Sequence, residues 1–175
     1  MYAETGWQQN INKNGMKQLS VVIALYNEED NVVPLLQQVQ KALQDIDHEL
    51  ILVDDGSTDR SVAIIQQHLG QDMKLVVLRR NYGQSAAMAA GIGVASGEYI
   101  ATMDADLQND PSDIPKMLRQ LISEDWDLVA GMRAKRRDGL LLRKIPSIIA
   151  NKIIRGSTGV TLHDYGCTLK VFKGE

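Results

Sequence analysis

The sequence predicts an α/β fold with a mainly parallel sheet, and three features of its apolar pattern predict it. Short apolar runs of strand length alternate strictly with helical patterns along the chain. The runs are continuously apolar and rich in Val, Ile and Leu, as are strands that helices cover on both faces. Strict alternation of strand and helix implies right-handed βαβ units. We therefore expect a parallel sheet flanked by helices.

Each expected element follows from its own residues. The expected strands span residues 20–25, 49–53, 74–78, 98–103 and 127–130. The expected helices span residues 32–43, 62–69, 85–95 and 114–122. Three of these helices repeat apolar residues at three- and four-residue spacing, whereas the third along the chain consists of small apolar residues that suit close packing on a sheet. Ser57 or Thr58 is expected to cap the second helix.

The chain of 175 residues is long enough for one hydrophobic core and short for two. Residues 1–18 are polar, Asn/Gln-rich and aperiodic, which predicts a disordered lead-in before a single domain at 19–175. Another apolar run begins at 171, where the chain is about to end. We therefore expect the domain to be truncated at its C-terminus.

Composition narrows the function classes. The single cysteine, Cys167, excludes an internal disulfide and fits a reducing compartment. No apolar run approaches the roughly 20 residues that span a bilayer. Net charge is −3, but residues 133–155 hold eight basic side chains against one acid, which leaves the rest about ten charges negative. This asymmetry favours a local anionic partner, such as a phosphate or an acidic membrane face, over nucleic acid; a solvated helix face is the alternative.

Polar residues follow four of the expected strands, at residues 26–29, 54–57, 104–108 and 131–133. Because ligands bind beyond the carboxyl ends of parallel strands, these carboxylates should gather at one edge. The repulsion between crowded carboxylates must be relieved by protonation or by a bound cation. Asp104, Asp106 and Gln108 offer oxygen ligands that suit Mg²⁺ or Mn²⁺, with phosphate oxygens completing the shell. The alternative is a cluster of turn and cap residues before Pro111.

Three motifs carry a resemblance to a known family. They read VVIALYNEE at 21–29, VDDGSTD at 53–59 and MDADLQ at 103–108. Together they resemble family 2 glycosyltransferases of the GT-A fold, a Rossmann-like fold. Within that family, residues 19–172 are similar to polyprenyl-phosphate sugar transferases, the dolichol-phosphate mannosyltransferase group and its undecaprenyl-phosphate relatives. The tetrapeptide at 164–167 looks closest to the transferases of a modified aminoarabinose.

The resemblance implies a role for individual residues. It implies a nucleotide-sugar pocket lined by Ala24, Tyr26, Glu28, Val53, Asp55, Asp104, Ala105 and Arg133. It implies that Mg²⁺ or Mn²⁺ is held by Asp104, Asp106 and Gln108. It implies catalytic roles for Asp106, Arg133 and Asp164, and contact between Arg143 and the acceptor phosphate. Ala24 departs from the pattern, because the family usually has proline there.

The implied function is inverting, metal-dependent transfer of a sugar from a nucleoside-diphosphate sugar, preferably a UDP-sugar, to a polyprenyl phosphate. The implied location is the cytoplasmic face of the cell membrane, with the basic segment against anionic lipid. Two alternatives stay open: transfer to a glycan hydroxyl with Asp164 as base, or a non-catalytic nucleotide-binding module. The relatives continue into amphipathic and membrane-spanning helices that are missing here, so exposed apolar surface could pair two copies as a homo-oligomer.

Overall fold

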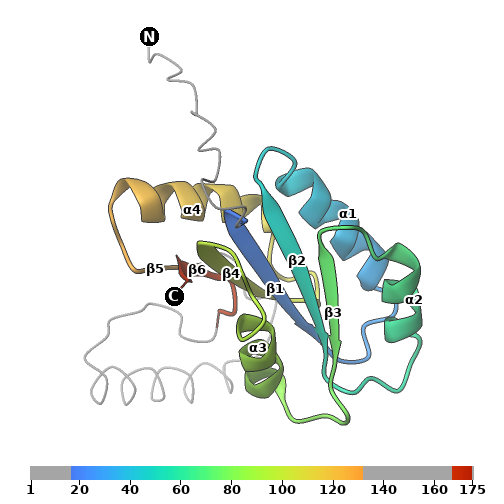
Figure 1. Cartoon of the computed structure of the whole chain (residues 1–175). Helices are drawn as coiled ribbons and strands as arrows, with labels where there is room; N and C mark the ends of the chain where they lie inside the picture. The colour runs from blue at the N-terminus through green and yellow to red at the C-terminus, as the bar shows by residue number, and fades with distance from the viewer. Residues whose placement is uncertain (1–16, 132–166, 175) are drawn as a thin grey trace, which may run out of the picture.

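The computed structural model describes residues 17–131 and 167–174. In this part of the chain a six-stranded sheet has the strand order β3-β2-β1-β4-β6-β5 (Figure 1). Strands β1 to β4 pair in parallel, whereas β6 is antiparallel to both β4 and β5. The elements in chain order are β1 (Leu19–Leu25), α1 (Val32–Ala42), β2 (His48–Asp54), α2 (Ser61–His68), β3 (Met73–Val77), α3 (Gln84–Ile92), β4 (Tyr99–Asp104), the 3₁₀ helix η1 (Pro111–Asp113), α4 (Ile114–Ser123), β5 (Leu128–Ala130) and β6 (Lys170–Lys173).

The predicted α/β fold with a mainly parallel sheet is confirmed. All five expected strands and all four expected helices are present, and none of their ends differs from the expected one by more than three residues. The apolar run at the end of the chain forms β6, which inserts between β4 and β5. That insertion was not predicted, because the partners of β6 lie far from it in the sequence and no local pattern specifies them.

The side chains of β1 alternate between two cores because successive residues of a strand face opposite sides of the sheet. Leu19, Val21 and Ile23 are fully buried with residues of α1, α2 and α4. Val22 faces the other side, where α3 packs (Figure 1). Gly91 permits this close approach, since a Cβ there would overlap Val22. The expectation that the third helix packs closely on the sheet is therefore confirmed.

The carboxylate of Glu49 is buried at the side of the sheet opposite the carboxyl ends of the parallel strands. It is 4% exposed. Its Oε1 accepts hydrogen bonds from Ser20 Oγ at 2.6 Å and from the N–H and hydroxyl of Ser96 at 2.7 and 2.8 Å. Lys74 Nζ lies 2.7 Å from its Oε2. Burial alone would raise the pKa of Glu49, but Lys74 and the two serines lower it to about 2.

Candidate functional site

The carboxyl ends of β1, β2 and β4 surround a cleft of about 270 Å³. The chain runs from β1 outward to β2 and β3, then returns to place β4 on the other side of β1. The cleft therefore lies at the switch point of the sheet, where open α/β folds bind ligands. Its lining comprises Ala24, Leu25, Tyr26, Glu28, Asp55, Asn81, Gly83, Gln84, Ala87, Asp104, Ala105 and Asp106.

The loops after β1 and β2 are joined by hydrogen bonds between their motif residues. The backbone N–H of Asn27 donates to Ser57 Oγ at 2.9 Å, and Asn27 Oδ1 accepts from the N–H of Thr58 at 2.8 Å. The N–H of Glu28 donates to Ser61 Oγ at 3.0 Å. Asn27 has a φ of 53°, in the left-handed region that Asn tolerates better than most residues. These contacts fix where the side chains of Tyr26 and Glu28 enter the cleft.

The start of α2 corrects one expectation. Ser57 and Thr58 do not cap this helix, which begins at Ser61; Ser57 Oγ accepts the N–H of Asn27 instead. Asp59 holds the helix start, because its two oxygens accept the N–H of Ser61 at 2.9 Å and of Glu29 at 3.1 Å. Burial would raise the pKa of Asp59, but these hydrogen bonds hold it below its usual range.

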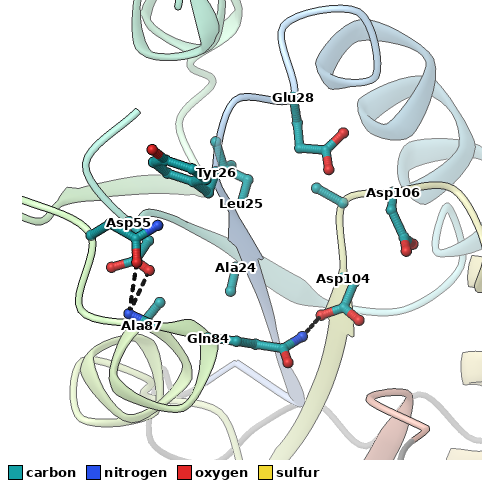
Figure 2. Close-up of a pocket in the computed structure, with 12 residues that line it drawn as sticks. Ala24, Leu25, Tyr26, Glu28, Asp55, Gln84, Ala87, Asp104 and Asp106 are labelled. Carbon is teal, nitrogen blue, oxygen red and sulfur yellow. Dashed lines mark hydrogen bonds between the residues drawn. The ribbon is translucent and has the colours of Figure 1, made fainter. Parts of the chain in front are cut away.

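Asp55 organises the side of the cleft toward β2. Its side chain is 3% exposed. Its two oxygens accept the backbone N–H groups of Tyr82 and Gly83, each at 2.8 Å. Gly83 has a φ of 93°, in the left-handed region, and directly precedes α3. Asp55 thus sets the loop from which α3 presents Gln84 to the cleft (Figure 2).

Asp104 and Asp106 line the other side of the cleft, as does Glu28 (Figure 2). Asp104 Oδ1 accepts a hydrogen bond from the amide of Gln84. Asp104 Oδ2 accepts one of 2.7 Å from the hydroxyl of Thr168, just before β6. Asp106 Oδ1 accepts the backbone N–H of Gln108 at 3.1 Å, which closes a turn after β4. Two carboxylates at one strand end therefore face the same space.

This donor set fits Mg²⁺ or Mn²⁺ as part of a shell. Within residues 17–131 and 167–174, no three His, Cys, Asp or Glu side chains are grouped to hold a metal ion. Asp104 and Asp106 supply hard oxygen donors, and Mg²⁺ commonly binds to one or two carboxylates together with substrate phosphates. An incomplete acidic set of this kind suits an ion that arrives with a phosphate ligand.

The structure brings most of the expected site residues together. Of the residues given roles by the resemblance, those that line the cleft are Ala24, Tyr26, Glu28, Asp55, Asp104, Ala105 and Asp106. Val53 is fully buried in the core beside α3, and Gln108 is exposed and outside the cleft lining. Arg133, Arg143 and Asp164 lie outside the described residues. Their roles stay predictions.

Sequence reasoning missed the part of the site that follows β3. Asn81, Gly83 and Gln84 all line the cleft. They stand after the third expected strand, where the carboxyl-end rule applied to every parallel strand would have found them. Thr168 was also missed, and no local signal marks it, because its contact with Asp104 spans 64 residues of sequence.

Comparison with known proteins gives relatives of one family. The model of "Glycosyl transferase family 2" matches residues 20–175. The chain is 51% identical over 161 residues to a dodecaprenyl-phosphate galacturonate synthase of Rhizobium johnstonii, covering 89% of this chain and 48% of the relative. It is 41% identical over 160 residues to an undecaprenyl-phosphate 4-deoxy-4-formamido-L-arabinose transferase of Pseudomonas aeruginosa, covering 89% of this chain and 47% of the relative. The chain thus spans about half the length of these relatives.

Solved structures share the fold at low identity. A mannosyltransferase of Pyrobaculum calidifontis in complex with GDP-mannose and Mn²⁺ matches with a TM-score of 0.65 and 20% identity, over 91% of this chain and 45% of that one. A glucosyl-3-phosphoglycerate synthase of Mycobacterium tuberculosis in complex with Mn²⁺, UDP-glucose and phosphoglyceric acid matches with a TM-score of 0.67 and 20% identity, over 90% and 56%. With the family model matched over residues 20–175, the chain belongs to glycosyl transferase family 2.

Proposed function

We propose that this chain forms the donor-binding part of an inverting, metal-dependent glycosyltransferase that moves a sugar from a nucleoside diphosphate to a polyprenyl phosphate. The charge of the cleft carries the proposal. Among the described residues its lining includes four carboxylates and no lysine or arginine. A nucleoside diphosphate is itself an anion, so it needs added positive charge to bind there. A divalent cation at Asp104 and Asp106 supplies that charge.

The two sides of the cleft suit the two ends of such a donor. Tyr26, a residue that is 43% exposed, and Asp55 offer an aromatic surface and a carboxylate to the base and ribose. Asp104 and Ala105 would lie along the ribose and diphosphate. Fold relatives solved with GDP-mannose and with UDP-glucose, both with Mn²⁺, support a donor of this class. We propose a UDP-sugar as the donor.

The chemistry is substitution at the anomeric carbon. A phosphate oxygen of the acceptor attacks that carbon from the face opposite the leaving group, the bond from carbon to diphosphate oxygen breaks, and its electron pair leaves with the nucleoside diphosphate. A phosphate monoester is already anionic at neutral pH, because its second pKa is about 6, so no general base is needed. A bound divalent ion would neutralise charge on the departing diphosphate.

The acceptor side is proposed from the sequence and from the relatives' names. The two relatives described above are a dodecaprenyl-phosphate galacturonate synthase and an undecaprenyl-phosphate 4-deoxy-4-formamido-L-arabinose transferase, so both names contain a polyprenyl phosphate and a sugar. We assign Arg133 to the diphosphate, Arg143 to the acceptor phosphate and Asp164 to positioning of the acceptor. Residues 133–155 would meet anionic lipid at the cytoplasmic face of the membrane. In the part of the chain that the structure describes, no helix has the length and apolar character to cross a bilayer.

Calorimetric titration tests the donor site. UDP and GDP are titrated into the protein with Mn²⁺ and with chelator. We expect one of the two nucleotides to bind only when Mn²⁺ is present. Asp106→Asn should weaken that binding by more than about 100-fold, because losing a metal ligand should cost more than losing a residue that only hydrogen-bonds to a ligand. The matched control is Asp45→Asn, which changes an exposed carboxylate at the opposite edge of the sheet and should leave binding unchanged.

Transfer to the acceptor is then measured with labelled sugar and a polyprenyl phosphate in detergent. Product with polyprenyl phosphate and none with the corresponding polyprenol would support phosphate as the nucleophile. Binding of nucleotide without metal would contradict the charge argument. Metal-dependent binding with no transfer to either acceptor would instead favour a non-catalytic nucleotide-binding module.

A further inference from the structure

Thr168 joins the segment before β6 to the acidic end of β4. Its hydroxyl donates a hydrogen bond of 2.7 Å to Oδ2 of Asp104 and accepts one of 3.1 Å from Nδ2 of Asn109. Because an amide N–H can only donate, the hydroxyl hydrogen of Thr168 is left for Asp104. The direction of donation is therefore fixed from Asn109 through Thr168 to Asp104.

Neighbouring groups hold Thr168 in this position. Its carbonyl accepts a hydrogen bond of 2.8 Å from the hydroxyl of Thr102, in β4. The thiol of Cys167, which is 2% exposed, donates to Oδ1 of Asn109 over 3.7 Å, and Asn109 is 8% exposed. These buried contacts orient the Asn109 amide so that its N–H faces Thr168. The hydroxyl thus has a fixed place beside Asp104.

Asp104 is contacted from two separate parts of the fold. Gln84, at the start of α3, donates to Oδ1, and Thr168 donates to Oδ2. These two donors are neutral groups that orient the carboxylate oxygens. Because these contacts order the Asp104 carboxylate in the folded chain, its side-chain entropy is lost during folding instead of when a cation binds.

We propose that Thr168 is a positioning residue that orients Asp104 for a divalent cation bound together with the nucleotide. The inference rests on the proposed function, because it requires a cation at Asp104 and Asp106. It adds a residue from the far end of the chain to the donor site. Loss of an outer-shell partner of a metal ligand typically lowers metal affinity 10–100-fold. Since Gln84 remains as the second donor, we expect about a tenfold loss without the Thr168 hydroxyl.

The test compares variants that differ in one hydroxyl. Thr168→Val removes the donor to Asp104, Thr168→Ala removes it without a branched side chain, and Thr168→Ser keeps it. Ser123→Ala is the control, because it removes an exposed hydroxyl that bonds the carbonyl of Gln120 in α4 and does not contact Asp104 or Thr168. Free Mn²⁺ is measured by electron paramagnetic resonance during titration in the presence of saturating UDP or GDP. Urea unfolding is recorded for each variant, and titrations are run where each is folded.

We expect Thr168→Val and Thr168→Ala to raise the Mn²⁺ dissociation constant about tenfold, and Thr168→Ser and Ser123→Ala to stay within about twofold of the natural chain. Equal Mn²⁺ affinity in the natural chain and in the two variants without the hydroxyl would overturn the inference. So would an equal loss in Ser123→Ala, since that hydroxyl makes no contact with Asp104 or Thr168. If the natural chain itself binds no nucleotide with Mn²⁺, the proposed function fails, and the inference fails with it.

Discussion

Glu49 offers a stability prediction whose size follows from the structure. Its pKa falls from the usual 4.5 to about 2 on folding. A carboxyl with this shift stabilises the native state by about 3 kcal/mol above pH 4.5. The sign follows from proton binding: the unfolded chain takes up a proton first as the pH falls, so the stabilisation is lost between about pH 4.5 and 2. Linkage gives a loss of about 2 kcal/mol already at pH 3.

The perturbation is Glu49→Gln, which keeps the side-chain shape but removes the charge next to Lys74. We expect its free energy of unfolding in urea at pH 7 to be about 2–3 kcal/mol lower than that of the natural chain. The difference should shrink as the pH is lowered to 3. Asp113→Asn is the control, because its partner Lys116 and Asp113 itself are both exposed, and its cost should stay below about 1 kcal/mol. A loss in Glu49→Gln that does not change with pH would refute the assignment of the effect to the Glu49 charge.

Two further substitutions test how the cleft is held. Gly91→Ala should lower the free energy of unfolding by about 1–3 kcal/mol in urea, because the new Cβ overlaps Val22. Gly93→Ala should not lower it, because its Cβ meets only two backbone oxygens, at 3.4 and 3.7 Å. Asp55→Asn replaces one of two acceptors with a donor that faces a backbone N–H, so we expect faster hydrogen exchange at Tyr82 and at least about tenfold weaker nucleotide binding. Unchanged exchange at Tyr82 in this variant would contradict the role given to Asp55.

The parallel part of the fold could be predicted because its signals are local. The runs that became β1 to β4 are continuously apolar, and the residues that follow them carry the cleft. Since the carboxyl ends of parallel strands lie at one edge, the grouping of Asp55, Asp104 and Asp106 followed from the parallel direction of the strands alone. The same rule was not applied after β3, and so Gln84 was missed.

Other parts depend on contacts that no local pattern encodes. The place of β6 between β4 and β5 is set by pairs such as Thr102 with Lys170, 68 residues apart. The role of Ser57 shows a different difficulty. Its hydroxyl accepts a backbone N–H, as a helix cap does, but the donor is Asn27 from another loop. The residue type indicates that the Ser57 hydroxyl can accept a backbone N–H, but it does not indicate which residue donates.

The uneven charge of the sequence can be explained through the cleft. Carboxylates from three strand ends face a space of about 270 Å³ whose described lining has no basic side chain. Among the donors to Asp55 and Asp104 are backbone N–H groups, an amide and a hydroxyl, which are neutral and orient the carboxylates. Such a site repels a diphosphate unless cations are supplied. In the proposed function a divalent ion and Arg133 supply them on the donor side, and the other seven basic residues of 133–155 supply them on the acceptor side. Because the acidic cleft and the basic segment lie in different parts of the sequence, we expect donor affinity to depend on the metal ion and acceptor affinity to depend on the salt concentration.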